Sequence, residues 1–334
     1  MPEKTVLNNK KILLLSPSFF SYEKTIKKRM EEMGAFVYFY DERAITSAFS
    51  RALLSIVPWL FTHRTRKYYR GILSELKNVS IDYIIVIKCD MIDTKVLKSF
   101  KDSFPRAKLC LYLWDSKKNI KGINKKIDLF DFASSFDRFD CLKDNRLKFR
   151  PLFFSSGPIN ESPKKKSDLC FCGTIHTDRY YILKRISDEA IAYGLTVNTF
   201  AYLQAKFMFF FYKVFGKGFK KAKKTEFSFK KKTMEEILIM ESESDVVIDI
   251  QDPKQSGLTM RTIEMVGANK RFITTNRDVE NYDFYNKDNI LIIDRNDPHL
   301  DFSFFGKEYQ KIPQHIYERY SIKSWILDVL GEKL

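Results

Sequence analysis

The sequence predicts an α/β protein made of two doubly wound, Rossmann-like domains, each built on a parallel sheet. Apolar runs of strand length alternate with helical stretches along most of the chain, which is the pattern of buried parallel strands joined by crossover helices. The alternation is interrupted near residue 155 by a stretch rich in Pro, Gly, Ser and Lys and then restarts. A length of 334 residues also fits two domains of roughly 150 residues each.

In the first half of the chain, the apolar runs predict strands at 11–15, 35–41, 82–87, 108–115 and 132–136, the last as a short edge strand. Helices are expected at 22–34 and 94–100. Gly34 is a natural helix stop, because glycine readily adopts the left-handed conformation found after helix ends. A strand, a helix and a second strand within about 30 residues form one βαβ unit.

In the second half, strands are expected at 168–172, 195–202, 245–250, 272–275 and 290–293, and helices at 179–193, 259–267 and 316–330. The predicted domains are 1–155 and 156–310. A final segment, 311–334, is expected to pack back toward the first domain. Sheets of this kind bind ligands at the carboxyl ends of their strands, so the sequence predicts a ligand site in a cleft between the domains.

The composition favours an anionic partner, and it predicts neither a membrane-spanning segment nor a signal peptide. The formal net charge is +16, while 44% hydrophobic and 30% charged residues are ordinary for a globular chain. No run of about 18 apolar residues and no signal-peptide pattern is present, so a cytoplasmic protein is expected. Cys170 and Cys172 form a C-x-C pair without a second Cys/His pair at zinc spacing, so neither a metal nor a bound cofactor is expected.

Two segments interrupt the alternation, 48–72 and 203–232, and the second holds ten Lys against the single acid Glu226. A helix with aromatic residues on one face and Lys residues around that face is typical of the headgroup layer of an anionic membrane. The candidate membrane or acceptor surface comprises Phe210, Phe211, Lys217, Lys220 and Lys221. The alternative is a buried helix followed by a solvated run of charge. Interleaved Lys and aromatic residues also suit nucleic acid, but no nucleic-acid-binding motif accompanies them, so that partner is not expected.

The chain lacks dinucleotide, P-loop and hydrolase signatures. Residues 255–274 hold the side chains that are best suited to binding a nucleotide. Gly257 follows a predicted strand and opens a predicted helix, where backbone N–H groups can hold a diphosphate. Arg261, one turn later, can pair with the same anion. Glu264 lies on the same helical face, and its carboxylate can accept both hydroxyls of a ribose. A surface helix with an Arg261–Glu264 ion pair explains the spacing equally well.

This segment resembles the nucleotide-binding helix of GT-B glycosyltransferases, whose pattern runs Gly-Leu, then Glu, then Gly and Lys before a strand. It is most similar to the CgeB-like and the capsule or lipopolysaccharide biosynthesis transferases with an R-x-x-E variant. The resemblance implies that Glu264 binds the ribose, with Arg261 as the accompanying Arg. Retaining members carry a second Glu where this chain has Gly257, and this departure favours an inverting reaction.

Residues 171–180 resemble the F-x-G-[ST]-x-x-x-x-R segment that opens the second domain of these families. There Gly173 allows close approach to phosphate and Arg179 supplies charge, while His176 is either a local hydrogen-bonding residue or a substrate contact. The full set of predicted donor-binding residues is Gly173, Thr174, Arg179, Gly257, Leu258, Thr259, Arg261 and Glu264.

In the first domain, a W/Y-x-D-like strand end at 113–116, an F-D-x-x-D element at 136–140 and a short strand at 150–154 match the same families. Asp115, at a strand's carboxyl end, is the candidate general base, with an N-cap as its alternative role. Asp90, at the end of the neighbouring strand, and His176 compete for the catalytic role.

The resulting expectation is a metal-independent GT-B glycosyltransferase without a cofactor. Its partners would be a nucleotide-sugar or other phosphorylated sugar donor, a glycan or lipid-linked acceptor of bacterial surface polysaccharide, and the anionic inner face of the cell membrane. Two alternatives stay open. One is a transferase that uses a phosphorylated sugar or polyol donor. The other is a non-catalytic basic membrane- or nucleic-acid-binding protein on the same fold.

Overall fold

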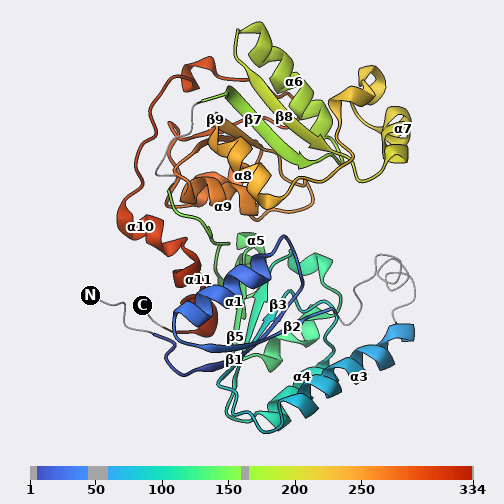
Figure 1. Cartoon of the computed structure of the whole chain (residues 1–334), viewed down its shortest axis with the longest axis vertical. Coiled ribbons are helices and arrows are strands. Elements are labelled where there is room, and N and C mark those ends of the chain that lie inside the picture. Colours follow the sequence, from blue (N-terminus) through green and yellow to red (C-terminus); the bar gives the residue numbers. More distant parts are fainter. Residues whose placement is uncertain (1–5, 44–58, 159–164, 333–334) are drawn as a thin grey trace. The chain divides into compact units, whose positions relative to one another are not determined.

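The computed structural model describes residues 6–43, 59–158 and 165–332. The chain forms two compact units (Figure 1): unit 1 is Met1–Leu152 together with Ser321–Leu334, and unit 2 is Phe153–Tyr320. The sequence suggested divisions at 155/156 and 310/311. The first division falls slightly earlier because Phe154 belongs to unit 2, where its backbone N–H donates to the carbonyl of Tyr320.

Unit 1 holds a six-stranded parallel sheet in the order β2-β1-β3-β4-β5-β6. Its strands are β1 Lys11–Ser16, β2 Phe36–Asp41, β3 Tyr83–Ile87, β4 Lys108–Leu113, β5 Phe132–Ser135 and β6 Lys148–Phe149. The five predicted strands are confirmed, but the expectation that 132–136 forms an edge strand is wrong. The two-residue strand β6 pairs with β5 and takes the edge.

Helices cover both faces of this sheet because successive side chains of a strand point to opposite sides. Its helices are α1 Tyr22–Glu32, α3 Trp59–Glu75, α4 Thr94–Ser103, α5 Arg138–Lys143 and α11 Ile322–Leu330. Leu111 and Leu113 join a buried cluster with side chains of α3 and α4. Tyr112, between them, points the other way, and its ring lies 4.8 Å from that of Trp325 on α11.

Unit 2 holds a five-stranded parallel sheet in the order β11-β10-β9-β7-β8. Its strands are β7 Ser167–Thr174, β8 Val197–Tyr202, β9 Ser244–Asp249, β10 Arg271–Thr274 and β11 Ile290–Ile292. Its helices are α6 Arg179–Ala192, α7 Lys206–Phe215, α8 Met234–Ser242, α9 Met260–Gly267 and α10 Gln314–Arg319. Leu169 and Phe171 pack toward α6, whereas Cys170 and Cys172 pack toward α8, so both faces of this sheet are also covered.

The predicted helix 316–330 is two helices, because α10 ends at Arg319 and Ser321 caps α11, its hydroxyl accepting from the backbone N–H of Ser324. Only α11 joins unit 1. Of the basic segment 48–72, residues 59–72 lie in α3 and the rest lies outside the described residues. Residues 159–164 of the predicted linker lie outside them as well. Across the ranges that the structure describes, no helix is long and apolar enough to cross a bilayer.

Candidate functional site

Three arginines of unit 2, here called the arginine cluster, lie near the carboxyl ends of its strands. Arg179 opens α6 after β7, Arg261 lies in the first turn of α9 after β9, and Arg295 follows β11. The charges of Arg261 and Arg295 both act on Arg179, so the three groups share one region. Because the carboxyl edge of a parallel sheet is where such folds bind ligands, this cluster is the candidate donor site.

Arg179 is the least satisfied member of the cluster. Its Nη1 donates to the carbonyl oxygen of Thr174 at 3.0 Å, but its buried Nε has no hydrogen-bond partner among the described residues. No described carboxylate forms a salt bridge with it. Burial lowers the pKa of Arg179 to about 10, with the positive charge of Arg261 acting in the same direction. A half-buried cation of this kind is stabilised by an anion that enters the site.

Arg261 is held by α8. Its Nε donates to Oε1 of Glu241 at 2.9 Å, and the Glu241 side chain is only 7% exposed. Burial opposes the charge of Arg261, but the charges of Glu241 and Asp249 outweigh it and raise the Arg261 pKa. Gly173 lies next to this guanidinium, since a Cβ at that position would be 3.6 Å from Arg261 Nη1.

The loop before α9 differs from the expectation that Gly257 opens the helix. The helix begins at Met260, and Thr259 is its N-cap, accepting from the backbone N–H of Thr262. Thr259 Oγ1 also donates to Asp249 at 2.8 Å. Gly257 and Leu258 are buried in the loop ahead of the helix, so Leu258 is a core residue and Thr259 ties the loop to the end of β9.

The carboxylate of Glu264 accepts hydrogen bonds from another residue of unit 2. It accepts from the backbone N–H of Ser155 at 3.2 Å and from Ser155 Oγ at 2.8 Å. Arg261 and Glu264 are one turn apart on α9, yet Arg261 reaches α8 while Glu264 reaches the segment after β6. A ribose at Glu264 therefore has to share the carboxylate with Ser155 or displace it.

His176 and the Asp178–Arg295 pair complete this region. Burial, followed by the charge of Arg179, lowers the pKa of His176, so its imidazole is neutral at pH 7. Arg295 binds Asp178 with two hydrogen bonds of 2.8 and 2.5 Å, and its Nη1 donates to the carbonyl oxygen of Gln251 at 3.0 Å. Sequence reasoning missed Arg295, since its partner lies 117 positions away and no local motif marks it.

In unit 1, Asp115 and Asp90 both lie beside Lys88. The Lys88 Nζ is 3.5 Å from Asp115 Oδ2 and 3.9 Å from Asp90 Oδ2. Lys88 and Cys89 both have positive φ, 75° and 61°, an uncommon conformation that concentrates at functional sites. The two candidate bases therefore converge on one ammonium group at the ends of β3 and β4.

The F-D-x-x-D element positions Asp115. Asp115 Oδ1 accepts from the backbone N–H of Ser116 at 2.9 Å, and Ser116 is the N-cap of the following turn, so the alternative role of Asp115 as the N-cap is wrong. Asp137 accepts from Ser116 Oγ at 2.6 Å, and Asp140 accepts from the backbone N–H of Lys117 at 2.5 Å. The motif thus fixes the loop that carries the candidate base.

Glu42 is a second residue that the sequence did not indicate. Its side chain is fully buried, Oε1 accepts from the backbone N–H of Met91 at 2.6 Å, and Oε2 has no partner among the described residues. Burial, with the charge of Asp90, raises the pKa of Glu42 to about 8. The carboxyl is thus protonated at pH 7. Its position after a strand gave no signal because Asp41 and Glu42 read as an ordinary polar strand end.

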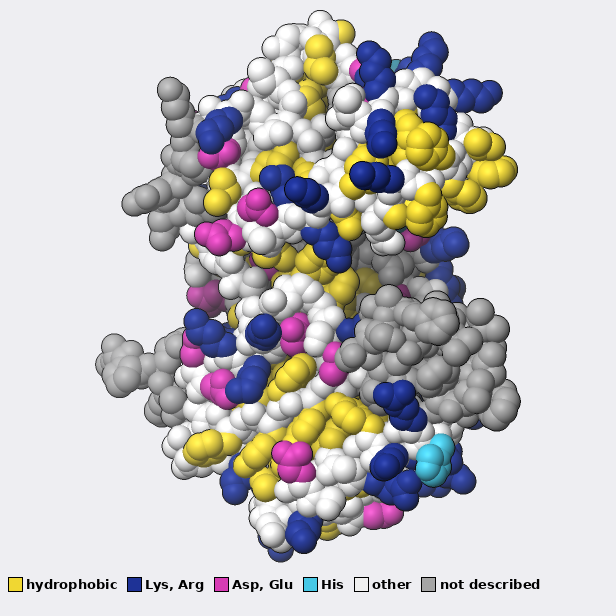
Figure 2. All heavy atoms as spheres, turned by 45° about the vertical axis from the view of Figure 1, so that its right-hand side comes forward, with side chains coloured by type: hydrophobic (Ala, Val, Ile, Leu, Met, Phe, Trp, Pro, Cys, Tyr) yellow, Lys and Arg dark blue, Asp and Glu magenta, His cyan; other side chains and the backbone are white. Residues whose placement is uncertain are grey.

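The predicted membrane or acceptor surface lies on α7 and the turn after it. Five apolar side chains of α7 are at least half exposed, and they are called here the aromatic face: Phe207, Phe210, Phe211, Val214 and Phe215. The opposite side of the helix packs on the core through Phe209. Figure 2 shows hydrophobic side chains among Lys and Arg on this part of unit 2. In the described part of the chain, no cluster of His, Cys, Asp and Glu is suited to a metal ion.

The chain matches no protein-family model and no curated protein. Solved structures share its fold. The apo lipopolysaccharide outer core galactosyltransferase WaaB has a TM-score of 0.50 at 11% identity, with 97% of this chain and 100% of that one covered. The N-terminal domain of trehalose-6-phosphate phosphatase from Candida albicans also has a TM-score of 0.50 at 11% identity, with 98% and 97% covered. These similarities, with the two parallel sheets, show two Rossmann-like domains of the GT-B type.

Proposed function

We propose that this protein is a glycosyltransferase that takes a sugar from a nucleotide donor bound in unit 2. The observation that carries the proposal is Arg179, a half-buried guanidinium at the start of α6 without a described carboxylate partner. A helix N-terminus and a cluster of guanidinium groups suit a diphosphate. Because a leaving diphosphate gains charge in the transition state, such groups favour transfer. WaaB, which shares the fold, is described as a galactosyltransferase.

In this proposal Glu264 binds the ribose, and Asp115 in unit 1 accepts the proton of the attacking hydroxyl. The acceptor is a glycan, lipid-linked or growing, of bacterial surface polysaccharide at the inner face of the membrane. The aromatic face of α7 and the net charge of +16 support that location. The CgeB-like assignment and an inverting outcome rest on the sequence pattern alone.

Thermal unfolding of the full chain with UDP, GDP, CMP, ADP and phosphoribosyl diphosphate tests the donor class. One nucleotide should raise the Tm, since a ligand at 100 times its Kd stabilises by about 2.7 kcal/mol. A shift with phosphoribosyl diphosphate alone would favour a phosphorylated-sugar donor. No shift with any compound would remove the proposal and leave a non-catalytic binding protein.

The variant Glu264→Gln tests the ribose contact. We expect the transfer rate to fall about 10²-fold, because a neutral amide replaces the charged acceptor of two hydroxyls. The fold should persist, since the amide oxygen can still accept from Ser155. Radiolabelled sugar transfer and circular dichroism measure the two effects, and normal transfer by this variant would move the nucleotide site elsewhere.

A further inference from the structure

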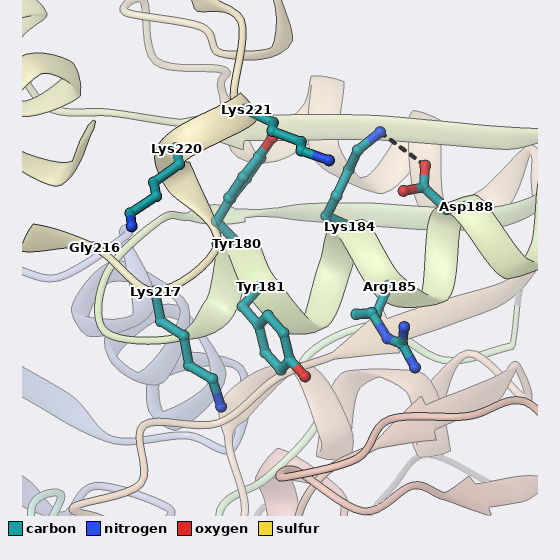
Figure 3. A pocket seen from close by; sticks show the side chains of 10 residues that line it. Tyr180, Tyr181, Lys184, Arg185, Asp188, Gly216, Lys217, Lys220 and Lys221 are labelled. Atoms are coloured by element: carbon teal, nitrogen blue, oxygen red, sulfur yellow. Dashed lines mark hydrogen bonds and ion pairs between the residues drawn. The ribbon is translucent and has the colours of Figure 1, made fainter. Parts of the chain in front are cut away.

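A basic pocket of about 460 Å³ lies in unit 2 between α6 and the turn that follows α7 (Figure 3). Its α6 wall consists of Tyr180, Tyr181, Lys184, Arg185 and Asp188, and its other wall consists of Gly216, Lys217, Gly218, Lys220 and Lys221. Neither the arginine cluster nor the candidate base contributes a side chain to it. The pocket is therefore separate from the proposed donor site.

Two glycines shape the second wall, and Gly218 brings it close to α6. Gly218 has φ of 80°, and a Cβ there would lie 3.1 Å from the Cβ of Tyr181. At Gly216 a Cβ would meet the carbonyl oxygen of Tyr212 at 2.6 Å. Because a side chain at Gly218 would force a shift, this glycine allows the turn to pack closely against Tyr181, while Gly216 allows the chain to turn sharply at the end of α7. Lys217 Nζ then lies 4.1 Å from the centre of the Tyr181 ring.

The charge of the pocket is uneven between its walls. On α6, Lys184 is paired with Asp188 at 2.7 Å, and Arg185 lies 3.7 Å from Asp297. Across the described residues, Lys217, Lys220 and Lys221 form no salt bridge with a carboxylate. Figure 3 shows Lys221 extending from its turn toward Lys184. Ammonium groups of this density around a small pocket suit a phosphate, which offers several charged acceptor oxygens.

The surroundings of the pocket identify the source of the phosphate. The turn of Lys217 directly follows the aromatic face of α7, where Phe215 is 74% and Phe211 is 53% exposed. A large exposed apolar patch beside basic side chains is typical of a helix lying in a membrane interface. An aqueous phosphate ester makes no use of such a face, whereas a phospholipid presents its phosphate next to acyl chains.

We infer that this pocket binds the headgroup phosphate of an anionic phospholipid while the aromatic face of α7 enters the same leaflet. The inference rests on the membrane association within the proposed function, but it does not depend on the identity of the sugar donor. Lys217, Lys220 and Lys221 line the pocket and bind the phosphate, and the glycine turn holds their backbone close to Tyr181. The pocket thereby sets the orientation of unit 2 on the lipid surface.

The test is co-sedimentation of the full chain with vesicles of phosphatidylcholine alone or with 30% phosphatidic acid or phosphatidylglycerol. The pocket variant carries Lys217→Gln, Lys220→Gln and Lys221→Gln. The matched control carries Lys230→Gln, Lys231→Gln and Lys232→Gln, which removes the same charge from the same basic segment outside the pocket. We expect at least a tenfold loss of binding to acidic vesicles for the pocket variant and about a twofold loss for the control.

Equal losses for the two variants would overturn the inference, because diffuse attraction between charges does not distinguish them. Binding of free glycerol phosphate in the pocket without vesicle binding would overturn it too, as would retention on a polyanionic glycan or RNA alone. A third variant, Phe211→Ser with Phe215→Ser, should lose vesicle binding at 0.5 M salt, where the screened charges contribute little. The nucleotide-induced Tm shift, measured on every variant, reports the proposed donor site separately.

Discussion

Arg179 and Arg261 lie in one cluster but differ in what balances their charge. Arg261 has the buried carboxylate of Glu241 at 2.9 Å, so it is part of a completed ion pair. Arg179 has a backbone carbonyl and an unpartnered Nε within the described chain. A cation left in this state costs folding free energy, and its use is in binding an anion. Arg179 is therefore the member of the cluster that we propose binds the diphosphate of the donor.

Replacing each arginine separates these two roles. Arg179→Met should lower donor affinity about 10²-fold or more while leaving the Tm unchanged or higher, because a desolvated charge is removed. Arg261→Ala should destabilise the fold by about 3–5 kcal/mol, because it leaves Glu241 buried without its partner. Calorimetric titration with the nucleotide and urea denaturation measure the two effects. Equal destabilisation by both substitutions would contradict this division of roles.

Glu42 gives unit 1 a pH-dependent stability. Its pKa is raised to about 8 in the fold from an ordinary value of 4.5, so between these values the folded protein holds a proton that the unfolded chain releases. Stability should therefore fall as pH rises from about 4.5 to about 8, at up to about 1.4 kcal/mol per pH unit. Lys88 and Lys126 oppose the shift but do not cancel it.

Glu42→Gln should remove this slope, because the amide does not titrate. The measurement is urea denaturation from pH 5 to pH 9 for both proteins, with the exposed Glu32→Gln as the control substitution. The wild type should lose stability relative to Glu42→Gln as the pH rises, and the control should follow the wild type. Parallel curves for wild type and Glu42→Gln would show that the carboxyl is ionised at neutral pH.

The loop after β4 is the element on which the candidate chemistry of unit 1 depends. Asp137 and Asp140 of the F-D-x-x-D element hold Ser116 and Lys117, and so fix Asp115 beside Lys88. We expect Asp115→Asn to lower the transfer rate about 10²-fold with little change in donor affinity. Asp140→Ala should give a smaller loss by loosening the loop.

Steady-state kinetics on the two variants, with Asp90→Asn as the comparison, tests whether Asp115 is the general base. Asp90 is the more exposed carboxylate, with a side-chain exposure of 40% against 19% for Asp115. A loss with Asp90→Asn and none with Asp115→Asn would transfer the role to the end of β3. Full activity in both would leave His176 as the remaining candidate.

The sequence predicts an element well when the element is buried on both sides. Each continuous apolar run gave a strand within about two residues, because a parallel strand covered by helices needs such a run. The short strand expected at 150–154 lies instead at Lys148–Phe149, as β6, because a strand of two residues has no apolar run that fixes its position. Helix α8 was missed, although Thr233 and Glu236 form a capping box, which is a sequence signal for the start of a helix.

The site was harder to predict than the fold, because its contacts join distant positions. The helix carrying Arg261 and Glu264 followed from local spacing, but their partners did not. Ser155 meets Glu264 across 109 positions, and Glu241 meets Arg261 from a helix that was not expected. A sequence pattern records which groups a helix carries, whereas the balance of their charges depends on the tertiary packing.

Each unit of the molecule has its own buried core, made of separate side-chain clusters. Calorimetry should therefore resolve two unfolding transitions. The nucleotide should raise only the transition of unit 2. Trp325→Ala should lower only that of unit 1, by about 3–5 kcal/mol, since its fully buried indole packs on Tyr112. A single transition that moves with both changes would show that the units unfold together.

Unit 1 is discontinuous in the chain, and this has a consequence for synthesis on the ribosome. Its sheet is complete by residue 149, yet α11, which packs on β4 and β5, is translated only after the whole of unit 2. At about 5–20 residues per second, roughly 9 to 35 seconds pass between completion of the sheet and synthesis of Trp325, and during this time the apolar surface around Tyr112 is uncovered. Unit 2 is uninterrupted and can fold first. The nascent first half is thus the stage at which this protein is most exposed to chaperones and to aggregation.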